Sequence, residues 1–440
     1  MNTPKLAFRN LARTKKRSVL LATAVAFGFL IVTCVDGLAS GAIENMSNQF
    51  SDMFGGDVFV SGVVQLNEDK NIDKITDMAL VKNTVAKANL EISYSSARTQ
   101  TQGTLVFNGV KTVTNTFGCD FIEESHLRDS LQLVEGSWDD IIEEPRSVIL
   151  SESTVEAMKA ELGDTILYKT ETVTGQQTLG ELILKGVSKD ISLLGSIAAY
   201  TQRAYTNELI GLEPSETNYY SIMLKRPEEQ ELAALQIQNL FAAQDLPVTD
   251  IQSARKKNAN SPISEISKQI KDSEPWEGSK YEVYSFNDIV PQFKTIPIIV
   301  SNVSLGVLLA IMLIVMIGIS NTFRMVLYER IREVGTMRAV GMRKKDAKSL
   351  FRWEAVLLSI MGALTGLILG IVVMEIVGFF PVNDPRLSFF IKNGYWTWKL
   401  SAFSLIWKFI VMILLTLLAV NGTAKSAAKL NPAEALRTVK

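Results

Sequence analysis

Four long apolar runs, separated by polar stretches, set the pattern of this chain. They lie at residues 18–40, 296–320, 355–380 and 401–421. Crossing a bilayer takes about 20 predominantly apolar residues at the rise of an α-helix. Four runs of this length in one chain disfavour the alternative that they are buried helices of a soluble protein. The pattern predicts four transmembrane helices.

The first run has a second interpretation as a cleaved signal peptide, because the small residues at its end, 38–40, resemble a cleavage site. Its apolar part is long for that role. We therefore expect it to be a retained helix.

The stretch 41–295 is long enough for a separate folded domain. Short strand-like runs bounded by Gly and Pro lie at 57–62, 103–110, 146–150, 164–170, 179–188 and 219–225. A helix is predicted from the capping residue Ser151 to Gly163, and another in 226–247 with Pro227 in its first turn. Residues 253–265 are polar and predict a loop. The mixture predicts an α+β domain with two subdomains.

Charge predicts the orientation of the helices. Basic residues gather in 1–17, 321–354 and 422–440, whereas 41–295 holds 38 acidic and 22 basic residues. Because basic flanks stay on the cytoplasmic side, those three segments are predicted to be cytoplasmic. The large domain and the loop 381–400 then lie on the opposite side. The net charge of −1 for the whole chain hides this asymmetry.

The segment 321–354 combines nine basic residues with a helical apolar pattern. Its apolar positions follow three- and four-residue steps: Leu327, Ile331, Val334, Met337 and Val340. Such an amphipathic helix can lie on anionic lipid headgroups or present a charged ridge to a cytoplasmic partner. The pattern alone favours neither. The stretch 4–18 is a second basic amphipathic segment, with Leu6, Phe8 and Leu11 as its apolar residues.

The third run contains Gly362, Gly366 and Gly370 at four-residue spacing. This spacing places them on one helix face, where the missing side chains let another backbone approach. We predict a helix–helix contact along this stripe, within the chain or across a dimer. Two charges, Glu375 and Lys408, lie inside apolar runs; they can reach the membrane surface or pair with each other.

The residues for common catalytic chemistry are sparse. His126 is the one histidine, so neither a His-pair metal site nor a Ser-His-Asp triad can be assembled, and it is interpreted as a surface residue. The sequence has no G-x-x-x-x-G-K-[ST] phosphate loop. Cys34 and Cys119 are expected to be structural. We predict no catalytic residue, metal site or nucleic-acid partner.

Three stretches together resemble the FtsX-like permeases of ABC transporters, a family that includes MacB and the lipoprotein-releasing subunits LolC and LolE. They are "LAFRNLARTKKRS" at 6–18, "NTFRMVLYERIREVGTMRAVGMRKKDAKSLFRWEA" at 321–355 and "AAKLNPAEALR" at 427–437. One span, a large outer domain and three further spans are also the layout of that family. The resemblance covers essentially the whole chain and implies a MacB-like periplasmic core domain.

The resemblance implies that 321–354 is a coupling helix region seated on a separate ATPase dimer, which holds ATP and Mg. The residues that match the motif are Glu329, Arg330, Arg332, Glu333, Gly335, Arg338 and Gly341. A second permease subunit, identical or homologous, and an inner-membrane location are also implied. The run 35–60 resembles the lipoprotein-releasing branch more closely, which implies extraction of lipoproteins and transfer to a periplasmic carrier. Export of peptides, toxins or drugs, as in MacB, is the alternative, and a sensor or scaffold without transport is an alternative of another class.

Overall fold

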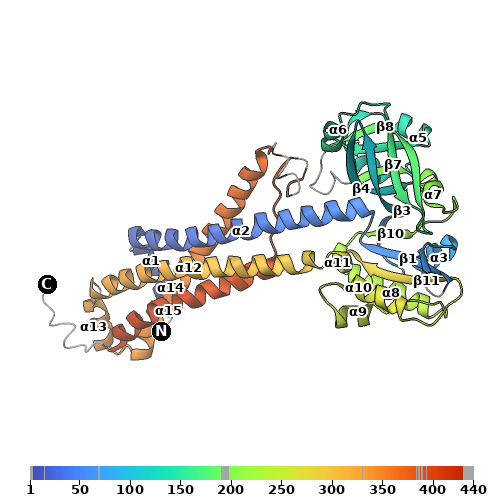
Figure 1. The fold of residues 1–440 in the computed structure, drawn as a ribbon. Helices are drawn as coiled ribbons and strands as arrows, with labels where there is room; N and C mark the ends of the chain where they lie inside the picture. The colour runs from blue at the N-terminus through green and yellow to red at the C-terminus, as the bar shows by residue number, and fades with distance from the viewer. Residues whose placement is uncertain are drawn as a thin grey trace. The chain divides into compact units, whose positions relative to one another are not determined.

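A computed structural model describes residues 3–13, 15–67, 70–189, 198–329, 331–382, 384, 387, 390–392 and 394–429. The chain divides into two compact units, which Figure 1 draws in one view. Unit 1 comprises residues 1–43, 296–382 and 391–440, and unit 2 comprises residues 44–295 and 383–390. Each unit has its own hydrophobic core, so each is described by itself.

Unit 1 is helical. Its elements are α1 (Thr3–Arg13), α2 (Lys15–Phe54), α12 (Gln292–Glu329), α13 (Ile331–Ala339), α14 (Lys344–Phe379) and α15 (Ala402–Lys429), with the far ends of α2 and α12 belonging to unit 2. Within α2, α12, α14 and α15 lie stretches long and apolar enough to cross a membrane. The helices are longer than the apolar runs: α2 extends to Phe54, and α14 already begins at Lys344.

The core of unit 1 is formed where the four long helices meet. Each helix contributes a side chain that is at most 2% exposed: Phe29 from α2, Met312 from α12, Phe351 from α14 and Met412 from α15. Large apolar side chains also cover the outside of this unit; Phe403, for example, is 82% exposed. Helices that are apolar all round are typical of membrane spans.

The N-terminal helix α1 packs on the same core. Ala7 is fully buried and Leu11 contacts the core, whereas Phe8 is 61% exposed. The helix is amphipathic as predicted, and Ala7 and Leu11 lie on its buried side, whereas Phe8 points away from the core. Asn10 of α1 donates a hydrogen bond of 2.7 Å to Oε1 of Glu354 on α14.

Unit 2 is built on a sheet with the strand order β11-β1-β10-β3-β4-β9-β6-β8-β5, to which β2 adds beside β1 and β7 adds beside β3 and β8. The strands are β1 (Val58–Asn67), β2 (Lys70–Asp73), β3 (Ile92–Phe107), β4 (Val110–Cys119), β5 (Leu133–Gly136), β6 (Ser147–Ser151), β7 (Thr165–Glu171), β8 (Gln177–Ser188), β9 (Ala198–Gln202), β10 (Tyr219–Leu224) and β11 (Ser279–Ser285). The first part of β3 pairs with β10, and the rest pairs with β4. This one strand therefore joins two subdomains.

Helices cover the sheet in both subdomains. They are α3 (Met78–Lys87), α4 (Ser125–Ser130), α5 (Trp138–Glu143), α6 (Glu152–Met158), α7 (Arg203–Ile210), the short 3₁₀ helix η2 (Pro227–Glu229), α8 (Gln230–Ala242), α9 (Ile251–Lys257), α10 (Pro262–Lys271) and α11 (Phe286–Ile289). α3 and α8 bury the face that carries Val58, Val60 and Val283. The predicted α+β domain is confirmed.

Two local predictions are confirmed in part. Ser151 caps α6, since its side chain accepts a hydrogen bond from the backbone N–H of Thr154. The predicted stop at Gly163 was wrong, because α6 already ends at Met158 and Lys159 adopts the left-handed conformation. Pro227 opens η2, which leads into α8 as expected.

The polar stretch 253–265 is not a loop, so that prediction was wrong. It contributes to α9 and α10, with Pro262 in the first turn of α10. Ile266 and Ile270, four residues apart, are buried against Val63 of β1. Ile263, Ile266 and Ile270 follow three- and four-residue steps, so the helical pattern was present and the polar composition was the wrong guide.

Candidate functional site

The charged segment that follows α12 folds as α13 and ends in a tight turn. The N–H of Gly341 donates to the carbonyl of Arg338 at 3.2 Å, and the N–H of Met342 donates to the carbonyl of Met337 at 3.0 Å. This pair of bonds is the Schellman end of a helix. Gly341 has a φ of +114°, which only glycine adopts readily. The sequence therefore places glycine where the chain turns towards α14.

α13 is held on the helical core by one side. Met337 packs against the core of unit 1, and Gly335 is buried. Arg332 is exposed, and Val340, at the end of the helix, is 90% exposed. The exposed side of α13 thus presents Arg332 and Val340, away from the core of unit 1.

The remaining motif residues lie around this surface. Glu329 is exposed, whereas Glu333 and Arg338 are half-buried. The Nε and Nη1 atoms of Arg338 are buried without a hydrogen-bond partner among the described residues. Arg330 lies outside the described residues, as do residues 430–437 of the C-terminal motif.

The glycines of α14 lie against α2 of the same chain. A Cβ atom added to Gly366 would lie 2.3 Å from the carbonyl oxygen of Ala26, and one added to Gly362 would lie 2.8 Å from that of Ala22. Gly370 faces Thr33 in the same way, at 3.1 Å. The two backbones approach so closely that a larger residue at Gly366 requires α2 and α14 to separate.

A buried ion pair links three of the long helices. Nζ of Lys408 on α15 lies 2.6 Å from Oδ1 of Asp36 on α2, and the two side chains are 1% and 7% exposed. Lys408 also donates to Oγ of Ser304 on α12 at 3.1 Å. Ser404 donates to Oδ2 of Asp36 at 2.8 Å. The four groups form one polar cluster inside an apolar bundle.

Sequence reasoning missed this pair. It considered Glu375 as the partner of Lys408, but Glu375 is exposed on α14. Asp36 was available as a signal, because it is an acid within the apolar run 18–40. Charges inside membrane segments are costly unless they are paired, so an acid and a base in two different spans are candidates for pairing.

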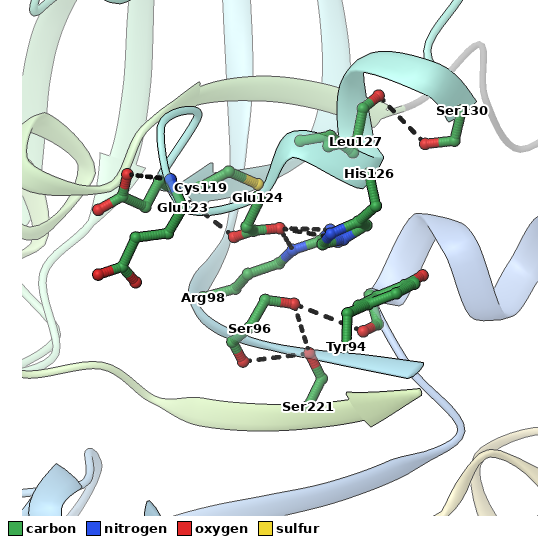
Figure 2. A network of polar contacts seen from close by, with 12 residues as sticks. Tyr94, Ser96, Arg98, Cys119, Glu123, Glu124, His126, Leu127, Ser130 and Ser221 are labelled. Atoms are coloured by element: carbon green, nitrogen blue, oxygen red, sulfur yellow. Dashed lines mark hydrogen bonds and ion pairs between the residues drawn. The ribbon is translucent and has the colours of Figure 1, made fainter. Parts of the chain in front are cut away.

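In unit 2, Arg98 forms the centre of a buried network (Figure 2). Its guanidinium is fully buried and lies 2.7 Å from Oε2 of Glu124. Its Nη1 donates to the carbonyl oxygen of Met53, at the end of α2, at 2.9 Å. Arg98 therefore connects α2 to β3, the strand that joins the two subdomains.

His126 belongs to the same network and is not a surface residue, which corrects the interpretation from sequence. Its imidazole stacks on Tyr94 with ring centroids 3.5 Å apart, and its Nε2 lies 3.8 Å from Oε2 of Glu124 (Figure 2). Its side chain is 21% exposed. Cys119 is buried, which raises the pKa of its thiol, as expected for a structural cysteine.

Two family models match the chain. The model described as "MacB-like periplasmic core domain" matches residues 18–240, and the model described as "FtsX-like permease C-terminal" matches residues 305–432. The second range contains α13 and the glycine stripe of α14.

Curated relatives are similar to this chain over different lengths. The macrolide export ATP-binding/permease protein MacB of Bdellovibrio bacteriovorus is 24% identical over 98% of this chain and 60% of its own length. The uncharacterized ABC transporter permease MJ1507 of Methanocaldococcus jannaschii is 27% identical over 40% of this chain and 43% of its own length. The chain thus spans less than two thirds of either relative.

Among solved structures, the periplasmic region of MacB from Actinobacillus actinomycetemcomitans is similar over 43% of this chain and 84% of its own. The sequence identity is 18% and the TM-score is 0.27. The periplasmic-core model alone matches 18–240 of the 440 residues, more than half of the chain. On that match, the chain belongs to the FtsX-like permeases of ABC transporters with a MacB-like periplasmic core domain.

Proposed function

We propose that this chain is a transmembrane subunit that relays the motion of a separate ATPase to its large outer domain. The observation that supports this most is the length of α12. It extends from Gln292 to Glu329 with Pro297 inside its first turns, and α13 follows. At 1.5 Å per residue its 38 residues span roughly 57 Å, whereas a membrane crossing needs about 30 Å.

The surface around α13 is the proposed contact with the ATPase. Glu329, Arg332, Glu333 and Arg338 supply charge, Val340 supplies an apolar anchor, and Gly341 fixes the turn. A displacement of α13 would be transmitted along α12 as far as Pro297, where the missing backbone N–H interrupts the helical hydrogen bonds. ATP and Mg would be held by the ATPase dimer, and two permease subunits would complete the complex in the inner membrane, with unit 2 in the periplasm.

Two substrate classes are consistent with this role. The run 35–60 resembles the lipoprotein-releasing branch, which supports transfer of lipoproteins to a periplasmic carrier. Export in the manner of MacB is supported by the names of relatives, which include macrolide export and pyoverdine export proteins. In both cases the permease does mechanical work, so the substrate need not pass between its helices.

The first experiment is a mild-detergent pull-down of the tagged full chain from its native membranes, with the co-purifying polypeptides identified. The parent chain is expected to recover a nucleotide-binding subunit at stoichiometric yield. Arg332→Glu combined with Val340→Asp should reduce that recovery about tenfold or more. Lys169→Glu, an exposed charge change on β7 of unit 2, is the control and should leave it unchanged. Equal recovery of the nucleotide-binding subunit with both variants would show that α13 does not form the contact. Recovery of the chain without such a subunit would favour the sensor or scaffold.

A second experiment separates the two substrate classes. In cells depleted of this chain, lipoproteins would accumulate in the inner membrane if lipoprotein release is its role. If it exports small molecules, lipoprotein sorting would be normal and intracellular accumulation of the exported compound would rise.

A further inference from the structure

Unit 2 contains a half-open cavity of about 580 Å³ that the family match does not assign to any role. Its floor is one face of β1 and β11, and its wall is α10. α10 lies between the two matched ranges, 18–240 and 305–432. A volume of this size lies within the range of small-molecule sites.

The floor of the cavity follows from strand alternation. On β1, Phe59, Ser61 and Val63 point to the cavity side, whereas Val58 and Val60 point into the core under α8. Pairing in the sheet places Tyr284 opposite Phe59 and Glu282 opposite Ser61 on β11. On the other side of β1, Asp73 of β2 lies opposite Val63. Two carboxylates thus flank one short stretch of β1.

The apolar part of the lining combines four aromatic with five aliphatic side chains. Phe59 stacks on Tyr284 with centroids 5.7 Å apart, and Tyr219 lies 6.0 Å from Phe59. Ile266 and Ile270 of α10 complete the wall. Aromatic rings present their negative faces to a neighbouring cation, so this lining suits a group that is both apolar and positively charged.

The charge of the cavity is acidic and is not neutralised from within. Ser61 donates to Oε2 of Glu282 at 2.7 Å, and no Lys or Arg is among the lining residues. Lys280, on the same face of β11, is directed to the Trp276 ring, 5.0 Å away, and to Ser273. Burial, together with the nearby Asp73, raises the pKa of Glu282 to about 7. The carboxylate therefore lacks a cationic partner.

We infer that this cavity binds a hydrophobic molecule that carries a protonated amine, with the ring system between Phe59, Tyr284 and α10 and the ammonium beside Glu282 and Asp73. The ligand would supply the positive charge that the lining lacks. The inference is independent of the ATPase-coupled role, because it depends only on the geometry of unit 2.

The test uses the purified full chain in lipid nanodiscs and three probes with the same ring: fluorotryptamine, the neutral fluorotryptophol and the anionic fluoroindole acetate. Binding is followed by fluorine NMR near pH 8, about one unit above the pKa of about 7 of Glu282, and empty nanodiscs correct for partition into lipid. The amine is expected to bind at least about tenfold more tightly than the alcohol, and the acid is expected not to bind.

Variants assign the binding to the cavity. Glu282→Gln keeps the size of the side chain and its ability to accept a hydrogen bond from Ser61, so the fold is preserved; it should weaken amine binding about tenfold. Asp73→Asn should weaken it by a similar factor. Glu181→Gln removes an exposed carboxylate of β8, 55% exposed, and should have no effect. Equal binding of amine and acid, or equal loss in all three variants, would overturn the inference, and neither result depends on the presence of an ATPase.

Discussion

Replacing Lys408 with Met tests whether the ion pair inside the bundle stabilises the arrangement of the helices. The substitution preserves most of the apolar volume. It leaves the carboxylate of Asp36, 7% exposed, with a hydrogen bond of 2.8 Å from Ser404 in place of the ion pair. Removing one partner of a buried ion pair typically costs about 3–5 kcal/mol, because the other charge remains buried. Asp36→Leu should cost a similar amount, since it isolates the ammonium of Lys408.

The double variant Asp36→Leu with Lys408→Met removes both charges. Replacing a buried ion pair with apolar side chains of similar size is often neutral, so its unfolding free energy should lie within about 1 kcal/mol of the parent. The double-mutant cycle then yields a coupling energy of several kcal/mol. Glu375→Leu, which changes an exposed charge on α14, is the matched control and should have little effect.

The assay is reversible unfolding of the full chain in mixed micelles, with helicity as the signal. If the effects of the two single variants simply add in the double variant, the two residues do not interact and the reasoning fails. ATP hydrolysis by the assembled complex is a second readout. On the proposed ATPase-coupled role, we expect the double variant to fold normally and yet to support less hydrolysis by the complex, because the ion pair no longer ties α2 to α15.

Three further predictions concern other contacts. Gly366→Ala should destabilise the bundle by about 1–3 kcal/mol, because the new Cβ atom meets the carbonyl oxygen of Ala26. Gly306→Ala is the control and should leave the stability unchanged, because no atom lies within 4 Å of the new Cβ. Thermal unfolding in detergent measures both variants. Gly55→Ala should destabilise unit 2 by more than Gly109→Ala. Both glycines have a positive φ, of +83° and +79°, but only a Cβ atom at Gly55 would contact Arg98. The difference between the melting temperatures of the two variants measures the effect of that contact. The raised pKa of Glu282 means that its carboxyl group binds a proton more tightly in the folded state than in the unfolded state. The unfolding free energy of the parent, measured relative to Glu282→Gln, should therefore be highest below pH 4.5 and should fall by about 3 kcal/mol as the pH rises through about 7. A difference that stays constant across that pH window would contradict this prediction.

The sequence predicted the long helices because the length of an apolar run is a local property. The same holds for the cap at Ser151, where one residue type satisfies the first backbone N–H groups of the helix. α10 was missed because the polar composition of 253–265 was given more weight than the helical spacing of Ile263, Ile266 and Ile270. Its packing on β1 depends on Val63, more than two hundred positions earlier in the chain.

The polar contacts were harder to predict for the same reason. Lys408 was recognised as an unusual charge, but its partner depends on which faces of α2, α12 and α15 meet. Similarly, Glu282 and Asp73 are ordinary acids in the sequence. Only the register of β11, β1 and β2 places both beside the same stretch of β1.

Both buried ionic clusters are connected to α2, which gives this helix a role that the resemblance did not imply. Asp36 ties it to α15, and the carbonyl of Met53 near its C-terminal end accepts a hydrogen bond from Arg98 of β3. The two positions are 17 residues apart on one uninterrupted helix, roughly 26 Å along its axis. Lys408 and Ser304 add a polar link between α12 and Asp36 to the apolar packing of α12 on α2, so on the proposed role weakening that cluster should reduce the response of unit 2 while the proposed ATPase contact at α13 stays intact. If weakening the cluster abolished the response of unit 2 and the binding of the ATPase together, the cluster would only maintain the fold.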